Sequence, residues 1–311
     1  MKTLPGPPPQ AKRRGAYRLR AGLFLGAILV LGSVLPGLSG ACENPPVLRF
    51  SIIPTEDTIQ ELGLYKPVLD YLSTVTGKKV EFYMPTSYAS VVEALVGKWV
   101  DVAVLGPNSY LIAREKDPTI QVFATYAKEK GHLQEEGPGY RSVLITKKGS
   151  KFTTIEALKG SVLALTDPAS TSGTLIPNVL FTKVIQMPLD RYFKKVVFSG
   201  EHDLSTLAVY DGKVDAAFVA THRLDDVVNL GKVKVEDFNI LWRSPVVPQD
   251  PFVYRGALCP ELKQKVEETF MSVGSQPSAK KFLANVHSAK FVKMTDADYD
   301  IVRELRKAAQ K

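Results

Sequence analysis

The fold is decided by the stretch Asp167-Pro168-Ala169-Ser170-Thr171-Ser172-Gly173-Thr174. An apolar run rich in strand formers precedes it at residues 161–166, and residues 175–184 have the pattern of a helix. Backbone N–H groups at the start of a helix lack intrahelical acceptors, and the helix dipole favours negative charge there. The hydroxyls of this turn therefore predict an anion cradle. The alternative is that one hydroxyl caps the helix and the others are solvated loop residues. Because Pro177 has no N–H, we expect the helix either to start near Thr174 or to begin with a kink.

Strands and helices alternate on both sides of this stretch. Such alternation is typical of the α/β class with a largely parallel sheet. Two matched decapeptides, residues 94–103 and 208–217, support an organisation in two similar halves. We expect strands at residues 47–53, 79–84, 100–105, 121–127, 140–146, 161–166, 194–198 and 214–220.

Three prolines make residues 242–251 extended rather than helical, which predicts a connector that crosses between two domains. Beyond Pro260 the pattern is helical, and we expect these helices to return and cover the first domain. The predicted division is a signal peptide at 1–41, a first lobe made of 42–143 and 251–311, and a second lobe at 144–250.

The beginning of the chain reads as a targeting segment. Residues 1–41 carry six basic side chains and no acids, then an apolar run at 21–34 and small residues before Cys42. This order is typical of a secretory signal, and the run is shorter than the roughly 20 residues that span a bilayer. We therefore expect a periplasmic protein. The junction before Cys42 also permits lipoprotein-type cleavage, which predicts a membrane anchor through a lipidated Cys42.

Charge and cysteine content exclude several classes of protein. Six positive charges leave with residues 1–41, which takes the formal charge from +8 to +2, so we expect no nucleic-acid partner. Cys42 lies at the cleavage site and Cys259 stands alone, so we expect no disulfide between them. About 270 residues follow the signal, enough for a large core and for two domains.

The sequence contains no familiar catalytic motif. Ser172 lacks the glycine of a nucleophile elbow two residues before it, and there is no Walker loop, Cys-x-x-Cys or His-Glu-x-x-His. Four histidines and two lone cysteines supply a metal site poorly. A Ser172–His202–Asp203 triad can be drawn, but adjacent His and Asp side chains seldom orient as base and orienting group. We expect a binding protein that needs no cofactor and no metal.

Four further side chains are candidates for binding an anion. His202, at the start of an expected helix, either donates to the anion or is a solvated loop histidine. Asp250 either holds a turn or accepts a proton carried by a bound oxyanion. Tyr88 and Tyr140 lie at the starts of elements, where aromatic packing is the ordinary role of tyrosine.

Six motifs occur in a fixed order between about Val47 and the region beyond Arg255. They are Leu105-Gly106-Pro107 with Tyr110, Tyr140-Arg-Ser-Val-Leu144, Ser170-Thr-Ser-Gly173 with Pro177, Ser199-Gly200-x-His202, Gly212-Lys-Val-Asp-Ala216 and Ser244-Pro-Val-Val-Pro-Gln-Asp-Pro251. Together, behind a secretion signal, they resemble the phosphate-, phosphite- and phosphonate-binding subunits of ABC transporters.

That resemblance implies a type II periplasmic-binding-protein fold, in which two α/β lobes joined by crossing strands close over a ligand. It also implies roles for individual residues. The turn of Ser170, Thr171 and Ser172 would take the phosphorus oxyanion by hydroxyl and N–H. Donors around it would be Tyr88, Tyr140 and His202, and Asp250 would accept from a ligand proton.

One departure from the family pattern concerns the strand that ends near Ala220. In aminoalkylphosphonate binders of this family an acid follows that strand and takes the ligand's ammonium, whereas here Thr221-His222-Arg223 follow. We therefore expect phosphate, phosphite or a short alkylphosphonate rather than 2-aminoethylphosphonate. The expected function is that of a monomeric solute-binding component that delivers this ligand to an ABC permease. The alternatives are a sensory binding module and a phosphoester hydrolase.

Overall fold

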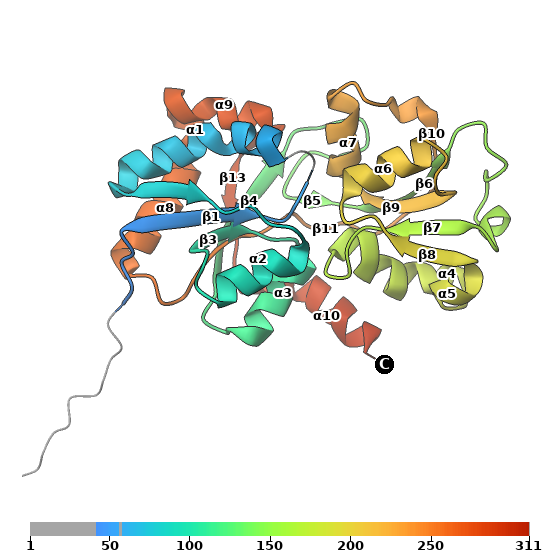
Figure 1. Cartoon of the computed structure of the whole chain (residues 1–311), viewed down its shortest axis with the longest axis horizontal. Helices are drawn as coiled ribbons and strands as arrows, with labels where there is room; N and C mark the ends of the chain where they lie inside the picture. The colour runs from blue at the N-terminus through green and yellow to red at the C-terminus, as the bar shows by residue number, and fades with distance from the viewer. Residues whose placement is uncertain (1–41, 56–57, 311) are drawn as a thin grey trace, which may run out of the picture. The chain divides into compact units, whose positions relative to one another are not determined.

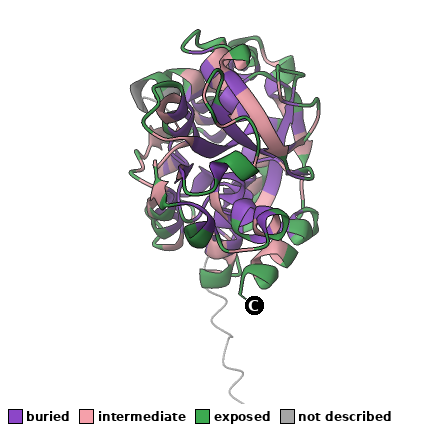
Figure 2. Ribbon diagram, turned by 90° about the vertical axis from the view of Figure 1, so that its right-hand side faces the viewer, coloured by how far each residue is buried: buried purple, intermediate pink, exposed green. Residues whose placement is uncertain are grey.

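The computed structural model describes residues 42–55 and 58–310, so the expected signal peptide lies outside the described residues. Within these ranges no helix is long and apolar enough to cross a membrane. Two large sheets carry helices on both faces (Figure 1). Their strands and the helices packed on them form the buried interior, and the exposed residues gather on the outer sides of the helices and in the loops (Figure 2).

The first sheet has six strands in the order β13-β4-β12-β3-β1-β2. β1 is parallel to β2 and β3, whereas β12 and β13 are antiparallel to their neighbours. Successive side chains point to opposite faces, so Phe252 packs under α1, α8 and α9 while Val253 packs under α2 and α3. The elements are β1 (Val47–Ile52), α1 (Thr58–Thr76), β2 (Lys79–Phe82), α2 (Tyr88–Val96), β3 (Val102–Val104), α3 (Pro107–Lys116), β4 (Gln121–Lys128), β12 (Phe252–Tyr254), α8 (Pro260–Ser272), α9 (Pro277–Asn285) and β13 (Ser288–Lys293).

The second sheet has five strands in the order β10-β6-β9-β7-β8. β7 is parallel to β8 and β9, and β6 is antiparallel to β9 and β10. One face packs under η3, α4 and α5, and the other under α6 and α7. The elements are β6 (Ser142–Lys147), β7 (Val162–Leu165), η2 (Thr171–Leu175), η3 (Pro177–Phe181), α4 (Thr182–Ile185), α5 (Leu189–Tyr192), β8 (Lys195–Phe198), α6 (His202–Tyr210), β9 (Ala216–Ala220), α7 (Thr221–Asn229) and β10 (Phe238–Arg243).

Two segments cross between the sheets. Residues 129–141 lead from β4 to β6, and residues 244–251 return from β10 to β12. They pair with each other through β5 (Gly139–Tyr140) and β11 (Val247–Pro248). The expectation of an extended connector before residue 252 is therefore confirmed. Two α/β sheets joined by crossing strands make up the type II periplasmic-binding-protein fold.

The C-terminal part differs from its prediction. Residues beyond Pro260 are not all helical, because β13 forms an edge strand antiparallel to β4. Lys290 and Lys293 make this strand hard to recognise in the sequence. Such charged side chains are common on the edge strands of sheets. The last helix, α10 (Asp300–Ala309), contacts α3 and also η2 and η3, so it does not cover the first sheet alone.

Helix formation after the hydroxyl-rich turn begins at Thr171, earlier than Thr174. The irregularity expected from Pro177 takes the form of wide π-helical turns in η2 and η3. Ile176 between them is also helical, so Pro177 lies inside one continuous helical run and not at its start.

A disulfide joins Cys42 to Cys259, so the expectation that these cysteines stay unbridged is wrong. Glu43 N–H donates to Ala257 O, and Cys259 N–H donates to Glu43 O, which places the two segments side by side. A separation of 217 residues conceals this contact in the sequence. One sulfur cannot carry both a disulfide and a lipid thioether. The expected lipid attachment at Cys42 therefore conflicts with this structure.

Candidate functional site

The hydroxyl-rich turn lies at the carboxyl end of β7. Ser170 is the N-cap of η2, and its Oγ accepts from Gly173 N–H at 3.1 Å. The capping alternative is thus correct for Ser170, whose own hydroxyl hydrogen remains a donor. Asp167 Oδ1 accepts from Ala169 N–H at 2.7 Å and fixes the entry to the turn. Only glycine fits at position 173, because a Cβ there would lie 2.0 Å from Thr166 Oγ1.

Helix α3 of the first sheet contacts this turn directly. Asn108 N–H donates to Thr171 Oγ1 at 2.8 Å, and Asn108 Nδ2 donates to Ala169 O at 3.1 Å. The Ser109 hydroxyl donates to the same carbonyl at 3.1 Å. All four residues are buried. The turn is therefore enclosed between elements of both sheets.

A small cavity adjoins the turn. The centre of a water molecule can occupy about 10 Å³ of it, close to the space that holds one water. Six of the seven residues predicted to bind the ligand line this cavity, namely Tyr88, Tyr140, Ser170, Thr171, His202 and Asp250. The seventh, Ser172, lies next to them, with its Oγ 3.4 Å from His202 Nε2.

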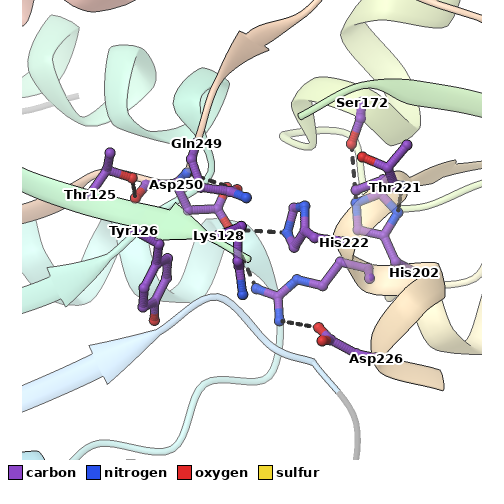
Figure 3. A network of polar contacts seen from close by, with 12 residues as sticks. Thr125, Tyr126, Lys128, Ser172, His202, Thr221, His222, Asp226, Gln249 and Asp250 are labelled. Carbon is purple, nitrogen blue, oxygen red and sulfur yellow. Dashed lines mark hydrogen bonds and ion pairs between the residues drawn. The ribbon is translucent and has the colours of Figure 1, made fainter. Parts of the chain in front are cut away.

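His202 is buried at the start of α6 and presents a single N–H (Figure 3). Its Nδ1 accepts from Ala220 N–H at 3.3 Å and lies 3.0 Å from Thr166 Oγ1. A backbone N–H can only donate, so Nδ1 carries no proton and Nε2 is the protonated nitrogen of a neutral ring. Burial, followed by the charge of Arg223, lowers the pKa of His202 to about 3. The N–H that can reach an anion is therefore Nε2–H.

Tyr88 and Tyr140 line the cavity from α2 and β5. Tyr88 N–H donates to the Asp167 carboxylate, and the Tyr140 hydroxyl forms hydrogen bonds with Thr171 and Ser172. Burial raises the pKa of both tyrosines, so both phenols keep their protons. Each is therefore positioned as a neutral donor.

An ion pair also lines the cavity. Arg223 Nη2 lies 3.3 Å from Asp250 Oδ2, and His222 Nε2 lies 3.9 Å from the same oxygen. Arg223 Nη1 is 3.9 Å from Asp226 as well. Burial raises the pKa of Asp250, and the positive charge of Arg223 opposes that rise. Thr125 holds the backbone here, because its hydroxyl donates to Asp250 O at 2.7 Å.

Sequence analysis did not assign His222 or Arg223 to the site. Both lie in the first turn of α7, directly after β9. Because β7 and β9 are parallel neighbours, their carboxyl ends meet at one edge of the sheet. The signal in the sequence for His222 and Arg223 was therefore their position directly after a strand of a parallel pair.

A wider cavity adjoins the small one, and His202, His222, Arg223 and Asp250 line both. The centre of a water molecule can occupy about 180 Å³ of the wider cavity, which gives room for several waters. Its apolar walls are formed by Leu64, Tyr65, Tyr126, Val227, Leu230 and Val286.

Comparison with known proteins is consistent with this arrangement. The family model described as "ABC transporter, phosphonate, periplasmic substrate-binding protein" matches residues 50–299. The phosphonates-binding periplasmic protein of Escherichia coli K12 is 32% identical over 88% of this chain and 80% of its own length. The phosphate-import protein PhnD of Mycolicibacterium smegmatis is 27% identical over 88% of this chain and 89% of its own.

A solved structure leads to the same family. The binding protein component of an ABC phosphonate transporter from Pseudomonas aeruginosa superposes with a TM-score of 0.78 at 28% identity. The match covers 86% of this chain and 87% of that one.

Proposed function

Because the chain belongs to the family of periplasmic phosphonate-binding proteins of ABC transporters, we propose that its small buried cavity captures the ligand. The chain is a solute-binding component that takes up a small phosphorus oxyanion and delivers it to a membrane permease. Its family acts in the periplasm.

The observation that carries the proposed site is the set of neutral donors around the small cavity. Hydroxyls of Ser170, Thr171 and Ser172 lie where η2 begins, and a helix start favours an anion. The neutral donors Tyr88, Tyr140 and His202 complete the set. Asp250 accepts a hydrogen bond from a protonated ligand oxygen.

Hinge closure explains how the ligand becomes enclosed. We propose that residues 42–143 and 251–311 form one lobe and residues 144–250 the other, each built on one sheet. The crossing segments paired through β5 and β11 act as the hinge. Ligand donors come from both lobes, so a bound oxyanion favours the closed arrangement.

Capture and release need no covalent step, no cofactor and no second chain, since every proposed ligand contact comes from one monomer. We also propose that the periplasmic protein carries Cys42 in the disulfide with Cys259 rather than under a lipid. Mass spectrometry of protein isolated from its native membrane and periplasmic fractions tests this. We expect an intact mass without lipid and no free thiol; a diacylated Cys42 together with a free Cys259 thiol would refute it.

Isothermal titration calorimetry with phosphate, phosphite, methylphosphonate and 2-aminoethylphosphonate tests the ligand. We expect at least one of the first three to bind more tightly than 2-aminoethylphosphonate, with sulfate as the control anion. Tightest binding of the aminoethyl compound would refute the ligand preference. Absence of binding by all four would refute the function.

A further inference from the structure

His222 lies where the small and the wider cavity meet, since it lines both. It is only 3% exposed, and its Nδ1 has no hydrogen-bond partner in the described part of the chain. A buried ring nitrogen without a partner is unfavourable. Neither oxyanion binding by the turn nor the ion pair of Arg223 with Asp250 uses this nitrogen.

The surroundings of His222 indicate what partner Nδ1 needs. Nε2 is the ring nitrogen that faces the Asp250 carboxylate, 3.9 Å away, and this negative charge favours a proton on Nε2 (Figure 3). In this tautomer Nδ1 is an acceptor. Burial, followed by the charge of Arg223, lowers the pKa of His222 and keeps the ring neutral. The missing partner is therefore a hydrogen-bond donor.

Three common ligand groups differ as partners for Nδ1. A carboxylate cannot donate. An ammonium donates but places a positive charge beside Arg223, which already holds Asp250. A hydroxyl donates without charge, and it fits a wall where the cation of Arg223 is already balanced by Asp226 and Asp250.

The wider cavity has room for an organic group next to the small one. Its accessible space of about 180 Å³ is far larger than the roughly 10 Å³ of the small cavity. Apolar walls from Tyr65, Val227 and Leu230 suit carbon atoms, and His222 lines both cavities. A substituent that reaches from the oxyanion into the wider cavity therefore lies near His222.

We propose that the ligand is a phosphorus oxyanion with a hydroxyl-bearing organic group, and that this hydroxyl donates to His222 Nδ1 while the group occupies the wider cavity. The proposal deepens the proposed function and rests on it. Hydroxyalkylphosphonates and glycerol-type phosphate monoesters share this chemistry.

Calorimetry with two matched pairs tests the proposal: ethylphosphonate against 2-hydroxyethylphosphonate, and propyl phosphate against glycerol 3-phosphate. We expect the hydroxyl compound of at least one pair to bind roughly 10-fold more tightly than its partner. The pair that shows the difference identifies the source. The compound 2-aminoethylphosphonate should bind more weakly than 2-hydroxyethylphosphonate.

Variants separate His222 from general effects. In His222→Leu the advantage of the hydroxyl compound should disappear, whereas His132→Leu should keep it, because exposed His132 lines only an outer cavity. His222→Phe replaces the leucine variant if the latter fails to fold in a thermal melt. The comparison is a ratio of affinities within each variant, so a general loss of oxyanion binding does not imitate it.

The outcomes distinguish this inference from the proposed function. Equal binding within both pairs by the native protein, or an advantage that survives in His222→Leu, overturns the role of His222. If phosphate, phosphite, methylphosphonate and ethylphosphonate all fail to bind, the proposed function falls, and this inference falls with it. Binding of the parents without any hydroxyl effect leaves the function standing and overturns the inference alone.

Discussion

Two strand-to-helix junctions of the second sheet lie side by side but differ in chemistry. One joins β7 to η2 and the other joins β9 to α7, and β7 and β9 are parallel neighbours. The first presents neutral hydroxyls and N–H groups fixed by short hydrogen bonds. The second presents His222 and Arg223 beside Asp250. Neighbouring positions in one topology can therefore differ in chemistry: the first offers neutral donors, and the second offers an ion pair beside a neutral histidine.

The largest effect on oxyanion binding is expected from Gly173→Ala at the neutral junction. The added Cβ would overlap the side chain of Thr166, which directly follows β7. The hydroxyl-rich turn would therefore have to move away from the end of that strand. We expect a loss of roughly 1–3 kcal/mol in the free energy of unfolding from overpacking, and oxyanion affinity reduced beyond detection by calorimetry. Gly63→Ala is the control, since its Cβ would meet no atom within 4 Å. Native affinity in Gly173→Ala would show that the turn does not hold the oxyanion.

Removal of one hydroxyl from the same junction should have a smaller effect. Ser172→Ala removes a donor next to His202, and a hydrogen bond to a charged group contributes about 1.5–3 kcal/mol, or roughly 10- to 150-fold in affinity. Calorimetry measures the change. Ser161→Ala removes another buried hydroxyl, one without a partner in the described ranges, and should leave affinity unchanged. Equal effects of the two changes would remove the distinction between this junction and the rest of the sheet.

Arg223→Met tests the charged junction. We expect oxyanion affinity to change less than about 10-fold, while stability falls because Asp250 loses its buried ion partner. Arg223 lowers the pKa of Asp250, so its removal raises that pKa further above the usual value. A folded protein whose buried carboxyl has a raised pKa loses stability as the pH rises. The melting temperature of the variant should therefore drop more at pH 8 than at pH 5. A pH-independent drop equal to that of Arg243→Met would argue against the pair.

The smallest effect concerns the protonation of His202. Because its ring is neutral, the ratio of oxyanion affinities between the native protein and His202→Gln should change less than about 2-fold from pH 5 to pH 8. A ratio that falls steadily with rising pH would mean that an imidazolium binds the ligand.

Protein stability gives an independent measure of the same histidine. The pKa of His202 is lowered from 6.5 to about 3, so the unfolded chain takes up a proton that the folded one refuses. The stability that the neutral, buried ring contributes is therefore fully present above pH 6.5 and is lost as the pH falls below 6.5. In urea titrations, His202→Gln should lose less stability than the native protein between pH 6.5 and pH 4. Identical losses would place His202 outside the buried set.

Local patterns predicted the neutral junction well. The strand at 161–166, the hydroxyl turn and the following helix are continuous in sequence, so propensity and capping rules were enough to place them together. The resemblance to a known family supplied Asp250, whose role the residues alone left open. The structure brings all seven predicted ligand residues close to one cavity, and their contacts with a ligand stay a prediction.

The charged junction and the disulfide could not be predicted in the same way. Arg223 meets Asp250 only because two sheets place residues 27 positions apart against each other. Cys42 meets Cys259 across 217 positions, and no local rule gives that distance. Sequence reasoning also missed β13 and expected only helices beyond Pro260, because an edge strand and an exposed helix both tolerate charge.

The hydrogen bonds from Asn108 and Ser109 to residues 169 and 171 join α3 to the hydroxyl-rich turn through protein atoms only. They stabilise the closed form of the protein independently of a ligand, so the ligand-free protein is closed for part of the time. The larger the population of this closed form is, the less binding free energy the ligand must supply to complete closure. A permease that recognised only the closed form would therefore also respond to ligand-free protein. That response would increase with the strength of this contact.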